Sequence, residues 1–426
     1  MEISKLHHLF LKSQGVSTDT RSITAGQMYF ALKGPSFDGN QYCKQALANG
    51  ASYCVIDDPE AQLESQTILV DDVLTCLQHL AVFHRELLSI PVIALTGSNG
   101  KTTTKELIVA ALKQKYRVAY TKGNLNNHIG VPLSLLSITN EDEIAVIEMG
   151  ANAQKEIAFL SSLALPDIGL ITNYGKAHLE GFGGVEGVVK GKSELYDHLR
   201  KHAKKALVNL DDPIQMEKSK GLTQITFGKV EQADFIIEPT SSGNNFISAK
   251  FSGLEIHSQL TGQYNFNNIS IAISLASYFG LSPEEIKAGI ESYKPNNNRS
   301  QLDQGKANML LRDYYNANPS SVQVSIENFA GLKSEETPKW VILGDMFELG
   351  DYSNAEHQLA ADHAAKFDFE QVLLVGEAFM KTKSEALRFA STNELLSFLK
   401  ENEPSDKIIL IKGSRGMQLE KAADLL

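Results

Sequence analysis

Cysteine is scarce in this chain of 426 residues, which contains only three. None of them lies in a C-x-x-C pair, so we expect neither a disulfide framework nor a cysteine-rich zinc site. Buried thiols in a reducing compartment are expected at Cys43, Cys54 and Cys76.

Long apolar runs are also missing. No stretch approaches the roughly 20 consecutive apolar residues that a membrane helix needs. The opening segment MEISKLHHLFLKSQG lacks the basic region, apolar core and small-residue cleavage site of a secretory signal. We therefore expect a soluble cytoplasmic protein without membrane insertion.

An excess of basic residues is absent as well. The chain has 40 Lys and Arg against 51 Asp and Glu, which gives a net charge of −11. This balance argues against binding to nucleic acid or to an anionic membrane, although it leaves room for a local basic pocket for a small anion. We find no internal repeat and no low-complexity tract.

The length and the order of the predicted elements indicate an α/β protein of three domains, since roughly 150 residues is typical of one domain. We expect a small α/β domain at 1–88 and a central, mostly parallel nucleotide-binding domain at 89–300. A smaller, doubly wound, Rossmann-like domain is expected at 301–426, with four strands. Within the central domain, 223–260 is predicted to form short antiparallel strands as an appendage.

The stretch PVIALTGSNGKTTTKELIVAALK predicts a buried strand, a glycine turn and a helix. The turn faces a helix N-terminus, where free N–H groups and the helix dipole favour a phosphate. The glycine spacing is shorter than in the general P-loop, and an ordinary glycine-rich turn is the alternative. The predicted nucleotide-binding residues are Gly97, Ser98, Asn99, Gly100, Lys101, Thr102 and Thr103.

Three further residues suggest metal-assisted phosphoryl transfer. Glu148 follows a predicted strand, at the edge where parallel sheets bind ligands, and could hold Mg²⁺ near Thr102. His178 follows another strand in a glycine-rich loop, and Lys192 lies on a predicted helix. Taken singly, each of Glu148, His178 and Lys192 also fits a structural or solvated residue.

Together with their order along the chain, these segments resemble the Mur ligase superfamily from about residue 17 to residue 421. The resemblance implies ATP and Mg²⁺ as cofactors, with Lys101 on the β- and γ-phosphates. It further implies adenine, γ-phosphate and ribose contacts at Asn268, Arg299 and Asp313. The segments that carry it are TGSNGKTTTKE, TKGNLNNHIGVP, EMGAN, TNYGKAHLEGFG, KSELY, RDYYNANPSS, LGDMFELG and KGSRGMQLE.

The same resemblance implies a second metal site at His178 and Lys192. An ammonium beside a cation is electrostatically unfavourable, and in the superfamily the matching lysine is carbamylated, which makes it an anionic oxygen ligand. We therefore expect a carbamate at Lys192. The expected catalytic residues are Lys101, Lys192, His178 and Arg299.

Substrate-binding residues are implied in the first and last domains and at two asparagines of the central one. The first domain resembles a module for a uridine-diphosphate sugar, and the loops after the strands of the last domain are expected to bind the amine acceptor. For the acceptor loops, helix capping and core-edge packing are the alternative. The residues are Asp19, Thr20, Arg21, Lys33, Gly34, Asp38, Gly39, Asn40, Asn126, Asn127, Asp345, Glu348, Lys412, Ser414 and Arg415.

Asn318 has a local explanation. It precedes Pro319 and suits the cap of a helix that begins at that proline.

The branch of the superfamily that adds D-alanyl-D-alanine to UDP-N-acetylmuramoyl-tripeptide through an acyl phosphate matches best, because of LGDMFELG and DYYNANP. Both substrates are small molecules, and we expect a monomer. A muramyl ligase that adds one amino acid and a folylpolyglutamate synthetase are the alternatives within the superfamily. A nucleotide-dependent regulatory protein without turnover is the alternative from another class.

Overall fold

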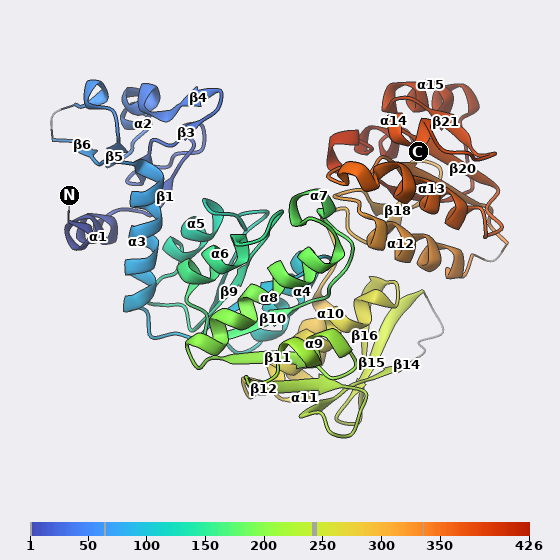
Figure 1. Cartoon of the computed structure of the whole chain (residues 1–426), viewed down its shortest axis with the longest axis horizontal. Helices are drawn as coiled ribbons and strands as arrows, with labels where there is room; N and C mark the ends of the chain where they lie inside the picture. The colour runs from blue at the N-terminus through green and yellow to red at the C-terminus, as the bar shows by residue number, and fades with distance from the viewer. Residues whose placement is uncertain (1, 64, 241–244, 335) are drawn as a thin grey trace.

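The computed structural model describes residues 2–63, 65–240, 245–334 and 336–426. Three lobes follow one another along the chain, and the central lobe connects the two outer ones (Figure 1). Each lobe combines helices with a largely parallel sheet, so the predicted three-domain α/β architecture is confirmed. Among the described residues, no helix combines the length and the apolar character that crossing a membrane requires.

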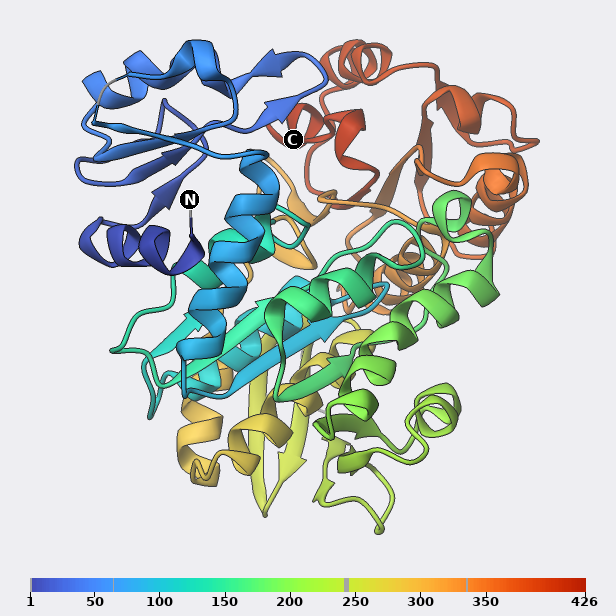
Figure 2. The ribbon, with the colours of Figure 1, turned by 60° about the vertical axis from the view of Figure 1, so that its left-hand side comes forward.

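The N-terminal lobe holds a four-stranded parallel sheet in the order β1-β2-β5-β6. A small hairpin of β3 (Lys33–Gly34) and β4 (Phe37–Asp38) lies on the side that faces the C-terminal lobe (Figure 1, Figure 2). The long helix α3 (Val73–Leu87) connects this lobe to the central one. The other elements are α1 (Ile3–Lys12), β1 (Val16–Ser17), β2 (Met28–Phe30), α2 (Cys43–Ala48), β5 (Tyr53–Ile56) and β6 (Thr67–Leu69).

The central lobe is built on a seven-stranded sheet in the order β13-β12-β11-β10-β7-β9-β8, and every pairing is parallel. The carboxyl ends of β7, β9 and β10 therefore meet at one edge, where open sheets bind ligands. The strands are β7 (Val92–Thr96), β8 (Val118–Tyr120), β9 (Ile144–Glu148), β10 (Ile168–Ile171), β11 (Lys205–Asn209), β12 (Thr223–Gly228) and β13 (Phe235–Ile236).

Strand β7 lies in the interior of this sheet, between β10 and β9, with all five residues buried. Its side chains alternate between two cores: Ala94 packs with the cluster that includes α6 and α8, and Ile93 and Leu95 pack with α4 and α10. Burial on both faces explains why the strand is a continuous apolar run. The helices of this lobe are α4 (Lys101–Leu112), α5 (Gly130–Leu136), α6 (Glu156–Ala164), α7 (Leu179–Phe182), α8 (Val185–Lys201), α9 (Pro213–Lys218), α10 (Tyr264–Tyr278) and α11 (Pro283–Ser292).

The predicted antiparallel appendage is only partly correct. Strands β12 and β13 extend the parallel sheet, because helix α9 carries the chain from β11 back to the same edge. Only β14 (Glu238–Thr240), β15 (Phe246–Phe251) and β16 (Leu254–Thr261) form an antiparallel sheet. A short strand has the same local pattern whichever partner it meets, so its direction of pairing depends on the crossover.

The C-terminal lobe has a six-stranded sheet in the order β17-β18-β22-β19-β20-β21. All pairings are parallel except that of the edge strand β17, so two strands add to the four that were predicted. The strands are β17 (Gln301–Gln304), β18 (Met309–Asp313), β19 (Lys339–Gly344), β20 (Gln371–Val375), β21 (Leu387–Phe389) and β22 (Ile408–Lys412). The helices are α12 (Pro319–Gly331), α13 (Ser353–Ala364), α14 (Glu377–Met380), α15 (Thr392–Asn402) and α16 (Glu420–Ala423).

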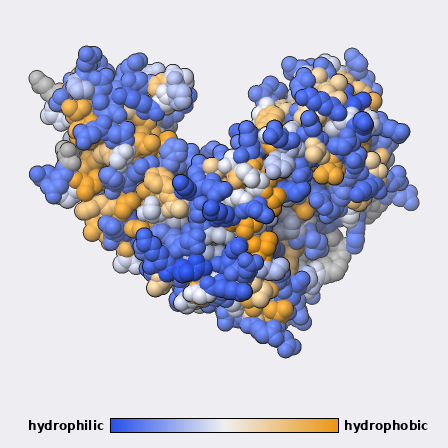
Figure 3. Space-filling model, viewed as in Figure 1, coloured by the Kyte–Doolittle hydropathy of each residue, from blue (hydrophilic) through white to orange (hydrophobic). Residues whose placement is uncertain are grey.

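A broad hollow separates the two outer lobes, and the central lobe forms its floor (Figure 3). The surface of the lobes is largely hydrophilic in this view.

Candidate active site

The turn between β7 and α4 is shaped by two glycines. Gly97 has a φ of +147°, and a Cβ there would lie 1.9 Å from Oγ1 of Thr172. Gly100 has a φ of +79° at the start of α4, and its Cβ would lie 2.7 Å from Oδ1 of Asn268. A side chain at either position would collide with its neighbour, so only glycine lets the loop approach Thr172 and Asn268 this closely.

Hydrogen bonds from the segment after β10 fix this phosphate loop. Oδ1 of Asn173 accepts from the backbone N–H of Asn99 at 3.1 Å, and the Ser98 hydroxyl donates to the carbonyl of Gly175 at 2.8 Å. Sequence reasoning missed Asn173, although an asparagine directly after a buried parallel strand was an available signal.

Lys101 is the first residue of α4, and its Nζ donates to the carbonyl of Gly97 at 2.7 Å. Burial lowers the pKa of Lys101 to about 8; the nearby Glu148 carboxylate raises this pKa and Arg299 lowers it, both to a smaller extent. An anionic phosphate in the loop would supply the counter-charge that this ammonium needs.

Glu148, at the end of β9, is 1% exposed. Its Oε1 accepts from Nδ2 of Asn126 at 2.7 Å and from Oγ1 of Thr102 at 3.3 Å. Among the described residues its Oε2 has no hydrogen-bond partner, and its nearest cation is Nζ of Lys105 at 3.9 Å. A buried carboxylate oxygen without a donor, beside a hydroxyl, fits a hard divalent cation such as Mg²⁺.

Lys105 was not singled out from the sequence. Its side chain is fully buried, and its Nζ donates to the carbonyl of Thr121 at 2.6 Å and pairs with Glu106 at 3.0 Å. It lies in the polar first half of α4, KTTTKE, where nothing local distinguishes it from a solvated lysine.

His178 and Lys192 have other partners in this structure. His178 lines the cavity described below and contacts Glu348 of the C-terminal lobe through Nδ1, an interaction that lowers the pKa of the Glu348 carboxyl. Lys192 is fully buried on α8, where Nζ donates to the carbonyl of Ala151 at 3.0 Å and lies 4.8 Å from the ring centroid of Phe182.

Lys192 does not line the cavity, and burial lowers its pKa well below the usual range. The described part of the chain contains no ready cluster of three or more His, Cys, Asp or Glu ligands. The second metal site is thus not assembled by these side chains as they stand.

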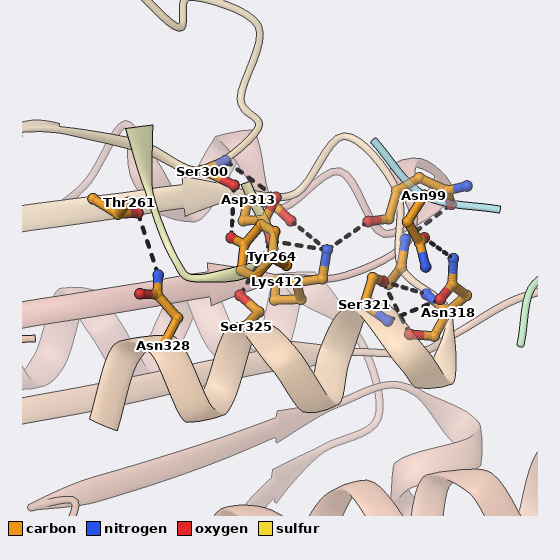
Figure 4. Close-up of polar contacts among 12 residues, drawn as sticks. Asn99, Thr261, Tyr264, Ser300, Asp313, Asn318, Ser321, Ser325, Asn328 and Lys412 are labelled. Carbon is orange, nitrogen blue, oxygen red and sulfur yellow. Dashed lines mark hydrogen bonds and ion pairs between the residues drawn. The ribbon is translucent and has the colours of Figure 1, made fainter. Parts of the chain in front are cut away.

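Asp313, from the C-terminal lobe, is surrounded by donors (Figure 4). Its carboxylate accepts from the Ser300 N–H at 3.2 Å and from the Ser325 hydroxyl at 3.1 Å, and Nζ of Lys412 lies 3.0 Å away. Lys412, predicted to bind the acceptor, is therefore a buried partner of Asp313. On the central lobe, Asn268 accepts from the Thr104 hydroxyl and donates to Asn265.

The guanidinium of Arg299 lies 3.8 Å from the ring centroid of Tyr315. That of Arg415 lies 5.3 Å from the same ring. The Nε of Arg299 is buried without a hydrogen-bond partner among the described residues. A guanidinium over an aromatic ring, with an Nε donor that has no partner in the described part of the chain, suits an anionic ligand. Tyr315 was missed by sequence reasoning.

One cavity of about 860 Å³ joins these groups. It contains the phosphate loop, Glu148 and His178 from the central lobe, Arg299 from the connecting segment and Asp313 from the C-terminal lobe. Its volume lies in the range of small-molecule sites. Asn126 and Asn127 line it as well, and Oδ1 of Asn127 accepts from the Gly130 N–H at the start of α5.

Other predicted residues lie outside this cavity. In the N-terminal lobe, Arg21 is 86% exposed and bonds to Asp19, lowering the pKa of that carboxyl to about 2. Lys33 pairs with Asp57 at 2.9 Å, and buried Asn40 donates to the same carboxylate at 2.8 Å. Also in this lobe, and outside the cavity, are Thr20, Gly34, Asp38 and Gly39.

The predicted acceptor loops are engaged locally. Both carboxylate oxygens of Asp345 accept backbone N–H groups, from Ala378 at 2.9 Å and Phe379 at 3.0 Å at the start of α14. The Ser414 hydroxyl accepts from the Phe347 N–H at 3.0 Å. Helix capping and loop packing, the alternative from the sequence, account for the contacts of Asp345 and Ser414.

Comparison with known proteins gives matches along almost the whole chain. Residues 12–85 match the Mur ligase family catalytic domain, residues 95–276 the Mur ligase middle domain, and residues 298–415 the Mur ligase glutamate ligase domain.

Two curated relatives that match over nearly their full length share one name. The UDP-N-acetylmuramoyl-tripeptide–D-alanyl-D-alanine ligases of Bacillus subtilis (strain 168) and Escherichia coli (strain K12) are each 34% identical to this chain. The matches cover 96% of this chain and 92% and 93% of those proteins. Crystal structures of MurF from Acinetobacter baumannii and of MurF ligase from Thermotoga maritima in complex with ADP each superpose with a TM-score of 0.84. They are 29% and 26% identical, and each comparison covers 98% of this chain and 97% of the other.

Identity at this level over nearly the full length of both chains, on the same three-domain fold, shows that the chain belongs to the Mur ligase family.

Proposed function

We propose that this chain is an ATP-dependent ligase that joins D-alanyl-D-alanine to the terminal carboxylate of UDP-N-acetylmuramoyl-tripeptide, forming ADP and phosphate. One observation carries the proposal: the phosphate loop with Lys101 shares a cavity with Arg299, Asp313 and the buried Glu148, whose Oε2 has no donor among the described residues. The names of the full-length relatives support the choice of substrates. A cytoplasmic location fits an enzyme of peptidoglycan precursor synthesis.

The nucleotide would lie between two lobes. The N–H groups of the phosphate loop and Lys101 bind the β- and γ-phosphates, and Arg299 contacts the γ-phosphate. Asn268 and Asp313 contact adenine and ribose. Both side chains already have protein partners, so each ligand contact replaces or adds to one of those hydrogen bonds.

Thr102 and Glu148 would hold Mg²⁺, whose positive charge stabilises the charge on the transferred phosphoryl group. For the second site we propose His178 with a carbamate on Lys192. Carbamylation needs a neutral amine, and burial favours that form of Lys192. Before these residues could act as ligands, His178 would have to leave Glu348, and Lys192 the carbonyl of Ala151.

The proposed reaction begins by activating a carboxylate. A carboxylate cannot acylate an amine directly, because its oxygen is a poor leaving group. Attack of the substrate carboxylate on the γ-phosphorus gives an acyl phosphate and ADP. The amine of D-alanyl-D-alanine then attacks the acyl carbon, and the tetrahedral intermediate loses phosphate. Lys101 and Arg299 would balance the negative charge of the phosphoryl group as it moves.

The outer lobes would bind the other substrates. The exposed guanidinium of Arg21 suits a diphosphate, and the β3–β4 hairpin faces the hollow. We assign the amine acceptor to the loops around Glu348 and Arg415. One chain supplies all three lobes, so we infer a monomer as the active unit.

The test is ADP release measured with UDP-N-acetylmuramoyl-tripeptide, with and without D-alanyl-D-alanine. ADP formation that requires both substrates supports the proposal. Equal ADP formation with a single amino acid as the acceptor would assign the chain to another branch, and no turnover with any muramyl peptide would contradict ligase activity.

A further inference from the structure

The N-terminal turn of α12 brings the C-terminal lobe onto the phosphate loop (Figure 4). Asn318 caps this helix: its Oδ1 accepts from the Ser321 N–H at 2.9 Å, and the Ser321 hydroxyl accepts from the Asn318 N–H at 3.0 Å. Pro319 occupies the first helical position. The capping role predicted for Asn318 is thus confirmed.

The cap also fixes which way the Asn318 amide points. Because Oδ1 is used by the helix, Nδ2 is directed away from it, and it donates to Oδ1 of Asn99 at 2.7 Å. The two residues lie 219 positions apart in sequence and in different lobes. Asn318 is 8% exposed, so this hydrogen bond is largely shielded from water.

Asn99 is held by its backbone as well. Its N–H donates to Oδ1 of Asn173, and its carbonyl accepts from Nδ2 of Asn173 at 2.9 Å and from Oγ1 of Thr172 at 2.6 Å. With Oδ1 bound by Asn318, the Asn99 Nδ2 lies over Gly175, where a Cβ would be only 2.8 Å away. No acceptor for this Nδ2 is found in the described part of the chain, and Asn99 lines the nucleotide cavity.

A second contact from the same turn of α12 reaches the segment that supports the phosphate loop. The Ser320 hydroxyl accepts from the Lys176 N–H at 2.6 Å, next to the Gly175 carbonyl that accepts from Ser98. The first turn of α12 therefore contacts the phosphate loop directly, and also the segment that supports it.

We propose that Asn318 is a positioning residue that orients the amide of Asn99 toward the nucleotide phosphates when the C-terminal lobe is docked. It acts through Asn99, and it makes nucleotide affinity depend on the placement of the C-terminal lobe. This inference rests on the proposed function, since it requires that nucleotide binds at the phosphate loop.

The experiment measures binding of Mg-ADP to the full chain by calorimetry. Asn318→Ser keeps a good capping oxygen but is too short to reach Asn99. Loss of one shielded hydrogen bond should raise the Kd for ADP by about threefold to tenfold. The melting temperature of the ligand-free protein should change by no more than about 2 °C, because serine and asparagine are similar caps. The KM for the UDP-sugar substrate should stay unchanged.

Asn99→Ala should raise the Kd by a similar factor, and the double variant should be no weaker than either single one, because both remove the same bond. The matched control is Asn328→Ala, which removes the contact of the other end of α12 with Thr261 (3.2 Å) and should leave the Kd within about twofold.

Unchanged affinity in Asn318→Ser would overturn the inference, and so would independent, multiplying effects in the double variant. An equal loss in Asn328→Ala would also overturn it, because general docking of the lobe would then explain the effect. Absence of ADP binding by the wild type would instead reject the proposed function itself.

Discussion

Lys101 has a pKa lowered to about 8 by burial, so its charge changes in an accessible pH range. Below pH 8 the free protein has the ammonium ready for a phosphate, and above pH 8 it must take up a proton to bind one. The affinity for metal-free ADP should therefore fall as pH rises from 8 to 9.5, by up to about tenfold per pH unit. Lys101→Gln should bind ADP weakly with no such slope. Binding titrations at several pH values check this, and a wild-type affinity that is flat above pH 8 would contradict the phosphate role.

Lys192 allows a test of the proposed carbamate. Lys192→Ala should lose most activity, and acetate should restore part of it by supplying an anionic oxygen at the vacated position. Depleting bicarbonate at mildly acidic pH should inactivate the wild type reversibly. The exposed Lys190 on the same helix is the control, since Lys190→Ala should keep full activity. The measurement is the steady-state rate of Lys192→Ala with and without acetate. If activity is lost and acetate does not restore it, the carbamate is unsupported.

At the scale of elements, the short helix α14 depends on Asp345. Asp345→Ala removes an acceptor for two backbone N–H groups and should lower the free energy of unfolding by about 1–3 kcal/mol. Asp345→Asn keeps one acceptor oxygen, so its free energy of unfolding should fall by less than that of Asp345→Ala. Urea denaturation measures the loss. Unchanged stability with a raised KM for D-alanyl-D-alanine would show instead that Asp345 binds the acceptor.

The phosphate loop was predictable because strand, glycines and helix are contiguous, so its geometry is encoded locally. The direction of strand pairing was not predictable. The sequence QITFG of β12 fits a parallel or an antiparallel neighbour equally well, and which one it meets depends on α9. The contact between His178 and Glu348 joins two lobes and leaves no local pattern in the sequence. The cap at Asn318 was visible beside its proline, but its second hydrogen bond, to Asn99, depends on tertiary structure.

At the scale of the whole molecule, the three lobes surround a hollow, and the cavity with Lys101 lies between the central and C-terminal lobes. A substrate bound through Arg21 in the N-terminal lobe must bring its far carboxylate to that cavity, which requires the lobes to approach. We expect a smaller radius of gyration in small-angle scattering when the UDP-sugar substrate and a non-hydrolysable ATP analogue are both present.

In the Arg21→Ala protein, the radius of gyration should decrease only at a higher concentration of the UDP-sugar, while the affinity for ATP stays unchanged. A radius of gyration that does not respond to the two ligands together would contradict closure. Loss of ATP affinity in Arg21→Ala would contradict the assignment of the N-terminal lobe to the UDP-sugar.

The central claim is that ATP phosphorylates the terminal carboxylate of the muramyl tripeptide before the dipeptide attacks. The most direct measurement uses UDP-N-acetylmuramoyl-tripeptide labelled with ¹⁸O in that carboxylate, together with ATP, Mg²⁺ and D-alanyl-D-alanine, and determines the mass of the released phosphate. The account predicts that one labelled oxygen is transferred to each phosphate as the pentapeptide product forms. Unlabelled phosphate, or phosphate released without the pentapeptide, would contradict it.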